Sequence, residues 1–591
     1  DSIYMEAVQA LTGSGGWPLN VFLTPDGRPF FAGTYFPPQP RHGLPSWRQV
    51  IEGVAETYSQ RPDDVLHNAQ ALTRFIEQAQ HQAESDDALG PEVISDAYAA
   101  VARQFDLANG GFGSAPKFPQ PLGLEFVLRR LSRTRDPRSL QFLHLTLDRM
   151  AAGGIYDQIG GGFHRYSVDD VWLVPHFEKM LYDNALLARV YTSAFLATGD
   201  SRYRTVAEDT LEYMIRELQA PDGAFFSSQD ADSEGVEGRY YVWSLDEFFS
   251  VLGQDDGKLA ALYFGVTRGG NFEGETILTV ASSVESVAVD VALPAGVVRE
   301  TLSRARGALR QARARRTPPQ TDTKILAGWN ALAIRSLAEA GRIFGRPDFL
   351  EVAATAMRFI LTALRPDGRL VRSYLDGAGE VSAFLEDYAF CVEALIALYM
   401  TTFDHEYLRA GQELAHEMID RFRDDTGTFF DTAFDSTALI VRPRGLFDNP
   451  IPSGNSAAAF AFARLEALTG KAEYGEHAWS IFRAASKLLT SAPLSVSYAL
   501  SALDFQLSPP IQIAIAGSPE EAATDELIRA VFERHLPNAV VAVGAPDSMP
   551  LLDGRELRNG QPTAYVCEHF MCRVPVTDVA ALSAQLDAMT T

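Results

Sequence analysis

The feature that most constrains the fold of this chain is a repeated pairing of two kinds of helix around a short polar turn. The helix before each turn is apolar nearly all round, as in residues 185–191, and the helix after it has a single apolar stripe. The four clearest turns are residues 199–203, 345–349, 403–407 and 470–474. Helices that are apolar on every side belong inside and striped helices outside, so the pattern predicts a ring of helical hairpins.

The predicted fold is therefore mainly α, with an (α/α)6 six-hairpin toroid over residues 91–508. Tight glycine turns at residues 222–225 and 367–370 follow two of the outer helices and lead into short extended loops. An open solenoid is the alternative. It fits less well because solenoid repeats are more even in length and lack inner helices that are apolar on all sides.

Residues 1–80 predict a different architecture, a partial α/β segment. The expected elements are a helix end, two strands joined by a hairpin turn, and one long helix (residues 3–11, 19–23, 28–32 and 47–80). Two strands and one helix are too few for an independent sheet domain, so the segment leans on the rest of the chain or continues upstream. Residues 81–90 are expected to form a polar linker.

Residues 509–591 predict a small C-terminal α/β unit. Residues 511–516 and 539–543 are apolar runs typical of buried strands, and residues 520–535 form a helix between them. Gly517 follows the first strand, but no Gly-x-Gly-x-x-Gly pattern accompanies it, so a nucleotide-binding loop is not predicted.

The net charge of -25 argues against nucleic acid or an anionic membrane as the main partner. The basic run over residues 304–316 is interpreted as a solvated helix face rather than an anion site. No apolar run approaches the ~18 residues of a membrane span. We therefore expect a cytoplasmic protein that binds a small-molecule ligand, with its oligomeric state left open.

Three cysteines are too few for a secreted disulfide scaffold. Cys391 lies within an apolar helix and is expected in the core. Cys567 and Cys572 have four residues between them and are predicted to be reduced structural thiols, although a local disulfide or half of a metal site would also fit. No cofactor and no bound metal are expected.

The block of residues 153–166, followed by residues 175–184, combines glycine, histidine, carboxylate and aromatic side chains before a long apolar helix. Five glycines in ten residues cost backbone entropy, so close approach or positive φ is expected there. Polar groups on such a loop at a helix mouth suggest a functional site. A structural loop with capping residues is the alternative.

In a toroid, the loops that enter the inner helices surround one cup, and the polar clusters of this chain fall on those loops. The candidate catalytic residues are His176, Glu178, Asp183, Asp230, Asp232, Asp322, Glu386 and Asp387. The candidate ligand-binding residues are His164, Tyr182, Asn184, Lys324, Trp329, Asn330, Tyr388 and Asn455. Aromatic rings stack on sugar faces and paired carboxylates run acid–base chemistry, so such a cup suits a sugar. Each residue alone could instead be a helix cap.

His164 and His176 are the best candidates to titrate near neutral pH. The acidic loop of residues 227–235 could supply a general acid, or hold Ca²⁺ through Asp230, Asp232 and Glu234, or be no more than a solvated loop.

Several stretches together resemble one family, the thioredoxin-domain proteins related to spermatogenesis-associated protein 20. The matching stretches are residues 13–27, 33–38, 153–184, 229–235, 322–330 and 564–567. The resemblance implies a thioredoxin-like N-terminal domain joined to a six-hairpin domain similar to those of N-acylglucosamine 2-epimerases and related glycosidases. The family carries a Cys-x-x-Cys motif upstream of this segment, and this chain has none.

The resemblance also equates Pro18 with the cis-proline that faces the redox motif of the thioredoxin fold. It therefore predicts a cis peptide bond between Trp17 and Pro18.

Three functions remain open on the sequence. The first is a carbohydrate-active or sugar-binding toroid with isomerase, epimerase or hydrolase chemistry in its cup. The second is a thioredoxin-linked redox or protein-folding factor with a non-catalytic toroid, whose redox centre is missing here. The third is a non-catalytic scaffold.

Overall fold

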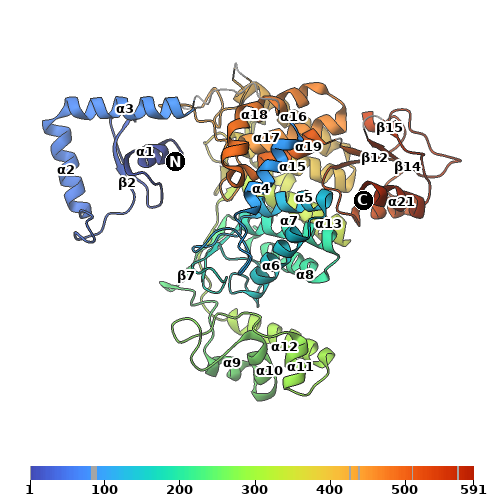
Figure 1. Ribbon diagram of the computed structural model, residues 1–591, viewed down its shortest axis with the longest axis horizontal. Coiled ribbons are helices and arrows are strands. Elements are labelled where there is room, and N and C mark those ends of the chain that lie inside the picture. Colours follow the sequence, from blue (N-terminus) through green and yellow to red (C-terminus); the bar gives the residue numbers. More distant parts are fainter. Residues whose placement is uncertain are drawn as a thin grey trace.

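The computed structural model describes residues 2–80, 89–424, 427–436, 440–508, 510–568 and 571–590, so most of the predicted linker lies outside the described residues. Its centre is a block of helices (Figure 1), and the contacts between these helices arrange them as a closed ring of hairpins. The inner helices are α5 (Pro121–Thr134), α7 (Leu181–Thr198), α13 (Ala327–Phe344), α15 (Leu385–Thr402), α17 (Gly454–Thr469) and α19 (Ser497–Leu507). Each inner helix packs on the next, and α19 packs back on α5, so the ring closes and the open solenoid is excluded.

The outer helices pack around this ring, and each contacts an inner helix. They are α4 (Pro91–Ala102), α6 (Pro137–Ala152), α8 (Ser201–Tyr213), α14 (Pro347–Ala363), α16 (His405–Phe422) and α18 (Ala472–Ser491). Inner helix α15 is buried along nearly its whole length, whereas outer helix α16 buries one stripe, as the sequence pattern predicts. The (α/α)6 prediction is confirmed.

The predicted polar turns reverse the chain between inner and outer helices. Gly199, Gly345 and Gly470 end inner helices with φ values of 73°, 68° and 69°, a left-handed conformation that glycine adopts without a Cβ clash. The Asp200 carboxylate then caps the next helix by accepting from the Arg202 backbone N–H at 2.9 Å. Local chemistry thus sets where each hairpin turns.

The N-terminal segment contains α1 (Ser2–Thr12), β1 (Asn20–Leu23), β2 (Pro29–Gly33), α2 (Trp47–Gln60) and α3 (Pro62–Gln80). The two strands pair antiparallel, as predicted. The single helix predicted over residues 47–80 is wrong. Pro62 has no backbone N–H to continue the helix and instead starts a second one at its first position. The Trp17–Pro18 peptide bond is cis, as predicted.

A small helical lobe interrupts the ring between α8 and α13, and the sequence reading did not separate it from the repeat. It consists of α9 (Leu245–Leu252), α10 (Gln254–Phe264), α11 (Val284–Asp290) and α12 (Ala295–Arg313), and it has its own apolar core (Figure 1). The basic run lies along and just after α12. It is not simply a solvated face, because Arg313 is buried and binds the Asp157 carboxylate through both terminal nitrogens.

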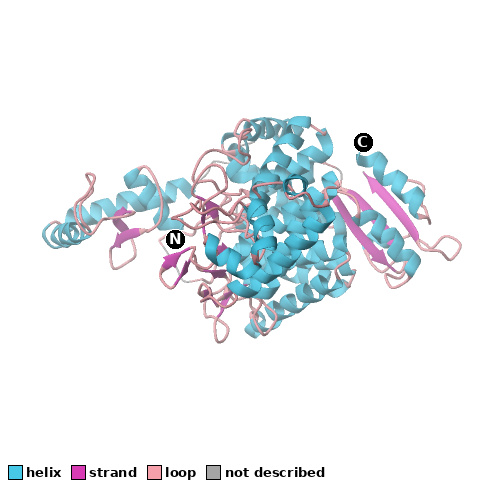
Figure 2. Cartoon of the chain, turned by 90° about the horizontal axis from the view of Figure 1, so that it is seen from below, coloured by secondary structure: helices cyan, strands magenta, loops and turns pink. Residues whose placement is uncertain are grey.

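The C-terminal unit is a mixed sheet with helices α20 (Ala522–Phe532) and α21 (Val579–Thr590). Its strands are β12 (Ile511–Ala516), β13 (Ala539–Gly544), β14 (Thr563–Glu568) and β15 (Met571–Cys572), in the order β13-β12-β14-β15. The parallel β12–α20–β13 unit is the predicted one, and β14 and β15 extend it antiparallel. The sheet shares its apolar core with the ring, on the side away from the N-terminal segment (Figure 2).

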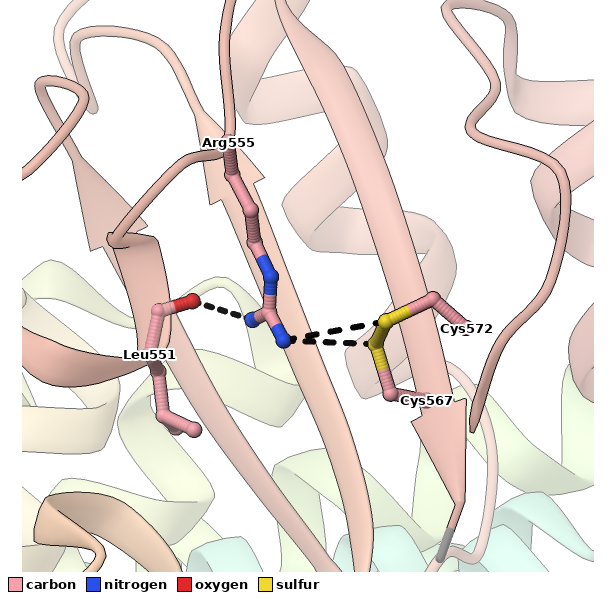
Figure 3. Close-up of a disulfide and its surroundings, with 4 residues drawn as sticks. All are labelled: Leu551, Arg555, Cys567 and Cys572. Atoms are coloured by element: carbon pink, nitrogen blue, oxygen red, sulfur yellow. Dashed lines mark hydrogen bonds between the residues drawn. A yellow bond between two sulfur atoms is a disulfide. The ribbon is translucent and has the colours of Figure 1, made fainter. Parts of the chain in front are cut away.

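Cys567 and Cys572 form a disulfide, so the prediction of reduced thiols is wrong (Figure 3). The antiparallel pairing of β14 and β15 sets the two residues directly opposite each other, with Cα atoms 3.9 Å apart. The Arg555 guanidinium donates to the Cys567 sulfur at 3.3 Å. Cys391 is buried and unpaired, as expected.

A buried ionic network crosses the interior of the ring. Arg189 binds Glu125 with both terminal nitrogens and Glu339 with its Nε, at 2.8–3.2 Å. Arg335 donates to Glu339 at 3.0 Å and to Glu393 at 2.7 Å. These residues come from α5, α7, α13 and α15, so adjacent inner helices supply each other's counter-charges. We refer to these five residues as the interior network.

Short strands line the loops that lead into the inner helices. They are β3 (Tyr166–Ser167), β4 (Pro175–His176), β5 (Lys179–Met180), β6 (Ser228–Gln229), β7 (Asp232–Ser233), β8 (Val236–Glu237), β9 (Thr321–Asp322), β10 (Ile325–Leu326) and β11 (Ser373–Tyr374). Figure 2 shows these loops gathered on the side of the ring that faces the N-terminal segment. Within the described part of the chain, the structure contains no helix with the length and apolar character needed to cross a membrane.

Candidate functional site

The glycine-rich loop of residues 153–166 packs tightly at the start of α7. A Cβ on Gly154 would lie 2.1 Å from the Leu173 carbonyl oxygen, so no side chain fits there. Gly162 has a φ of +79°, and a Cβ on it would lie 2.5 Å from the Tyr213 ring. Close approach and positive φ are both required, as predicted.

Two asparagines that were predicted to bind the ligand hold the loops before inner helices in place. Asn184 accepts from the Phe163 backbone N–H at 2.6 Å and donates to the Phe163 and Met180 carbonyls. Asn330 makes the same three bonds to Phe225 and Leu326 at 2.7–3.0 Å. Both amides are buried and their donors are fully used, which contradicts their assignment as ligand-binding residues.

Asn455 repeats part of the same arrangement on α17. Its Nδ2 donates to the Phe429 and Gly445 carbonyls, both at 3.0 Å. Its Oδ1 is buried and has no hydrogen-bond partner within the described part of the chain. This amide therefore fixes a loop as well, but it retains one unused acceptor.

Asp183, in the first turn of α7, is the most unusual carboxyl group of this face. It is 5% exposed, and its Oδ2 has no hydrogen-bond partner among the described residues. Burial raises its pKa well above the ordinary value, and the positive charge of Arg165 only partly offsets this. A protonated carboxyl at this position can donate a proton to a ligand oxygen.

An ion pair lies beside Asp183. Arg165 donates to the Glu178 carboxylate at 2.7 Å and lies close enough to Asp183 and Tyr182 to affect their pKa values. Arg165 thus binds Glu178 directly, whereas it only partly offsets the burial that raises the pKa of Asp183. Two neighbouring carboxyl groups in different electrostatic surroundings are an arrangement that acid–base chemistry can use.

Asp183 lines a pocket of about 310 Å³ together with Phe118 and Asp448. Asp448 accepts from the backbone N–H groups of Ser453 and Tyr498, at 2.9 and 2.8 Å. Burial raises the pKa of Asp448 to about 6, against these hydrogen bonds. The pocket is therefore bordered by two carboxyl groups whose pKa values are both raised by burial.

Aromatic rings lie around these carboxyls. Tyr182 meets Trp329 edge to face, with ring centroids 4.7 Å apart. Tyr166 packs against Phe118 at 4.8 Å and stacks on His176 at 5.1 Å. We call Arg165, Glu178, Tyr182, Asp183, Trp329 and Asp448 the cup.

His176 lies at the edge of the cup and is held by carboxylates. Its Nδ1 is 2.7 Å from Glu237 Oε1, and its Nε2 is 3.8 Å from Glu178 Oε2. Glu237 belongs to the hairpin formed by β7 and β8, so the acidic loop reaches β4 through this contact.

His164 is not a titrating site residue, which corrects the prediction. It is 1% exposed, its Nδ1 lies 2.8 Å from the Phe177 carbonyl oxygen, and it packs edge-on against the Phe177 and Tyr241 rings. Burial, together with the nearby positive charge of Lys179, lowers the pKa of His164 to about 3, so it is neutral at physiological pH.

The mouth of α15 contains a third acidic group. Glu386 binds Arg372 at 2.9 Å, and burial followed by repulsion from Asp387 raises its pKa. Asp431 lies close enough for Glu386 to raise its pKa, and burial contributes most to its pKa of about 7. Glu386 therefore remains a candidate, with Asp431 beside it.

Two other predicted residues of α15 have structural contacts. Asp387 accepts from the Gly328 and Phe384 backbone N–H groups and pairs with Arg372. It therefore caps the start of α15 and ties it to the start of α13. Tyr388 is buried, and its hydroxyl accepts from Arg421 of outer helix α16 at 3.0 Å. These contacts contradict a catalytic role for Asp387 and a ligand-binding role for Tyr388.

The remaining predicted residues lie on exposed loops. Asp230 and Asp232 are exposed, and Asp322 forms an ion pair with exposed Lys324 at 3.0 Å. The pairing of β6 with both β5 and β9 brings these loops alongside the start of α7. Over the described ranges, no group of three or more His, Cys, Asp or Glu could hold a metal ion, so the Ca²⁺ alternative finds no ligand cluster there.

Sequence reasoning missed Arg165, Asp448, Asp431 and Arg372. Arg165 lies between His164 and Tyr166 in the glycine-rich block, so its position in that block was an available signal. Asp448 and Asp431 lie in an irregular loop before α17 without a motif or periodicity. Only the packing of that loop on the ring reveals them.

Comparison with known proteins agrees with the resemblance seen in the sequence. Residues 1–77 match the family model Thioredox_DsbH, described as "Protein of unknown function, DUF255". Spermatogenesis-associated protein 20 of Homo sapiens is 34% identical over 634 residues, which cover 98% of this chain and 80% of the human protein. The chain belongs to the spermatogenesis-associated protein 20 family.

The Rattus norvegicus member of this family is 33% identical over 634 residues, with the same coverage of both chains. Among solved structures, the chain is similar to cellobiose 2-epimerase from Bacillus thermoamylovorans. That likeness has a TM-score of 0.45 at 9% identity and covers 67% of this chain and 87% of the epimerase.

Proposed function

We propose that the cup binds a polyhydroxylated small molecule, a sugar, and performs isomerase, epimerase or hydrolase chemistry on it. The observation that carries this proposal is Asp183, a buried carboxyl with an unpartnered oxygen and a strongly raised pKa at the wall of a pocket. Burying such a group costs stability, and strongly perturbed carboxyls in pockets are typical of functional sites.

In this proposal Asp183 is the general acid and gives its proton to an oxygen of the bound sugar. Glu178, which is paired with Arg165, or His176 accepts a proton from the ligand or from water. Trp329 and Tyr182 supply apolar faces for the sugar ring, and Asp448 offers a hydrogen-bond acceptor. Glu386 and Asp322 stay candidates for contacts with longer ligands.

The experiment is a thermal-shift and turnover screen of the purified chain against a panel of mono- and disaccharides. A ligand that binds the folded state raises its melting temperature. Asp183→Asn should abolish turnover of any sugar that the wild-type chain converts, while its circular dichroism spectrum stays unchanged. Asp246→Asn is the matched control, because Asp246 is an exposed carboxylate in the first turn of α9, outside the cup.

Equal turnover by Asp183→Asn and wild type would remove Asp183 from the chemistry. Failure of every sugar to shift the melting temperature would leave the scaffold hypothesis in place of the enzyme.

A thioredoxin-linked redox or protein-folding role is the second candidate, and the family match of residues 1–77 is the observation that favours it. Dithiol exchange needs an attacking and a resolving thiol. The paired cysteines of this chain lie instead in the C-terminal unit, at Cys567 and Cys572. We expect no insulin reduction above background, and activity that disappears in Cys567→Ser would contradict this.

A further inference from the structure

The disulfide between Cys567 and Cys572 lies at the outer edge of the C-terminal sheet, and its two halves differ in their access to solvent. Cys567 is on β14 and is completely buried, whereas Cys572 is exposed on the edge strand β15. Thiol–disulfide exchange begins when a thiolate attacks one sulfur of the disulfide, and access decides which sulfur is attacked. Solvent access therefore directs an incoming thiol to Cys572.

Stabilisation of the fold gives little reason for a disulfide at this place. The two cysteines are five positions apart, and the backbone pairing of β14 with β15 already sets them directly opposite each other. The Arg573 backbone N–H also donates to the Val566 carbonyl at 2.9 Å, so the pairing continues beyond the disulfide. Because a disulfide stabilises mainly by closing a loop, a bond across so short a loop gains less than one that joins distant segments.

Arg555, in the loop before β14, lies against both sulfurs. Its Nη2 donates to Cys567 Sγ at 3.3 Å and to Cys572 Sγ at 3.8 Å. Its Nη1 donates to the Leu551 carbonyl, which holds the guanidinium in this place (Figure 3). The positive charge is therefore nearer to the buried sulfur, the one that an attack on Cys572 would release.

No carboxylate of the described residues forms an ion pair with Arg555. Burial lowers the pKa of Arg555, and Tyr565 and the exposed Asp553 only partly oppose this. Glu568 follows Cys567 on β14, and successive side chains of a strand point to opposite faces of the sheet. Since an arginine stays protonated in proteins, its charge is available to an anion that forms at the disulfide.

We propose that the Cys567–Cys572 disulfide is a thiol–disulfide exchange site, which a dithiol reduces by attack on Cys572 while Arg555 stabilises the departing Cys567 thiolate. In the first step, a thiolate of the dithiol bonds to Cys572 Sγ, the bond between the two cysteine sulfurs breaks, and its electron pair leaves with Cys567. In the second step, the other thiolate of the dithiol attacks the reductant's own sulfur in this mixed disulfide. Cys572 then leaves as a thiolate and takes a proton from water. The protein gains two electrons, and the dithiol becomes a disulfide.

The position of Arg555 suits both ends of this reaction. A positive charge beside a sulfur favours its thiolate form, and a better stabilised thiolate leaves faster. In the reduced protein the better stabilised thiolate belongs to Cys567, which is buried and cannot reach a disulfide in another protein. The site therefore accepts electrons, which agrees with the expected absence of insulin reduction. It depends neither on the sugar chemistry of the cup nor on the thioredoxin-like segment.

The test uses the whole oxidised chain without denaturant and measures how fast dithiothreitol, a small dithiol, opens the disulfide. N-ethylmaleimide in denaturant stops each sample, and mass spectrometry counts the labelled thiols. Cys391 adds a constant label, so any further labels report the opened disulfide. Arg555→Met should slow the reduction about tenfold, since the leaving thiolate loses its cation. Arg558→Met is the matched control and should react like wild type. Arg558 is an exposed arginine of the same loop, and within the described part of the chain its side chain donates to neither sulfur.

A second measurement determines the direction of attack. Glutathione has a single thiol, so its reaction stops at the mixed disulfide, which N-ethylmaleimide traps by blocking the released thiol. Proteolytic cleavage after Glu568 separates the two cysteines, and the peptide masses show which sulfur carries glutathione. We expect glutathione on Cys572.

Three results would overturn the proposal: a disulfide that dithiothreitol opens only after the protein unfolds, equal rates for Arg555→Met and wild type, or glutathione attached to Cys567. Should Arg555→Met fail to fold, the position of glutathione on the wild-type chain decides by itself.

Discussion

The interior network and Asp183 of the cup both place buried ionisable side chains on inner helices, yet the two sites treat those side chains in opposite ways. In the network, Arg335 meets Glu339 and Glu393 within 3.0 Å, and Arg189 meets Glu125 and Glu339. In the cup, one oxygen of Asp183 has no partner in the described residues, and its pKa is raised well above the ordinary value by burial. The network stabilises the ring, whereas the cup leaves a carboxyl available for chemistry.

The difference teaches how position along one helix separates the two roles. Midway along the inner helices, adjacent helices face each other, so Arg189 and Arg335 find carboxylates on neighbouring helices. At the helix starts, the neighbours are irregular loops. The backbone groups of these loops already bond to side chains such as Asn184 and Asn330, so they are not available to a nearby carboxyl group. A carboxyl there is desolvated without being neutralised.

The largest loss of stability should come from removing one residue of the interior network. Arg335→Ala removes the guanidinium that binds Glu393 and Glu339, so we expect a loss of about 3–5 kcal/mol in the free energy of unfolding. Urea unfolding followed by circular dichroism measures this. The double variant Arg335→Met, Glu393→Met should recover most of the loss, since two apolar groups replace the broken pair. A single variant as stable as wild type would show that the network is not a stabilising element.

The next largest loss of stability should follow from removing an asparagine side chain that holds a loop in place. Asn184→Ala leaves the Phe163 backbone N–H and two carbonyls unpaired, and we expect a loss of about 1–3 kcal/mol in the same measurement. Asn449→Ala is the comparison, because Asn449 lines the pocket of the cup but is exposed. It should leave stability within about 0.5 kcal/mol of wild type. Unchanged stability in Asn184→Ala would return this amide to the list of ligand-binding residues.

The pH dependence of stability should expose Asp183. Its pKa is raised on folding, so the folded state binds more protons than the unfolded state above the ordinary value of 3.8. The free energy of unfolding should then fall as pH rises toward the folded pKa, by up to about 1.4 kcal/mol per pH unit. Asp183→Asn should lose this slope. Unfolding curves of the two proteins from about pH 4 upward give the difference; parallel curves would mean that folding does not shift the pKa of Asp183.

The smallest change in stability is expected from a substitution in the acidic loop of residues 227–235. Asp232 is exposed on a short hairpin, so Asp232→Asn should change the free energy of unfolding by less than about 0.5 kcal/mol. Its effect on sugar turnover, measured with any substrate from the screen, should also be small. A large loss of turnover would instead show that this loop closes over the cup when ligand binds.

The sequence by itself determined the ring. All-round apolar helices such as α15, striped helices such as α16, and the turns at Gly199 and Gly470 predicted alternating inner and outer helices, because local pattern records which face of a helix is buried. It also located the glycine-rich loop at the start of α7, since five glycines in ten residues have a conformational cause. The break at Pro62 could have been read from the same kind of signal.

Only the tertiary structure decided which polar side chains already have hydrogen-bond partners in the protein and which keep an unpartnered group. Asn184, Asn330 and Asp387 look like site residues in the sequence, but backbone groups more than 20 positions away in the chain occupy the first two, and Gly328 occupies the third. The raised pKa of Asp448 and the lack of a partner for Asp183 Oδ2 within the described residues have no sequence signature either. The physical reason is that a residue type gives a side chain its capacity to bond, whereas partners brought together from distant helices and loops decide whether that capacity is satisfied.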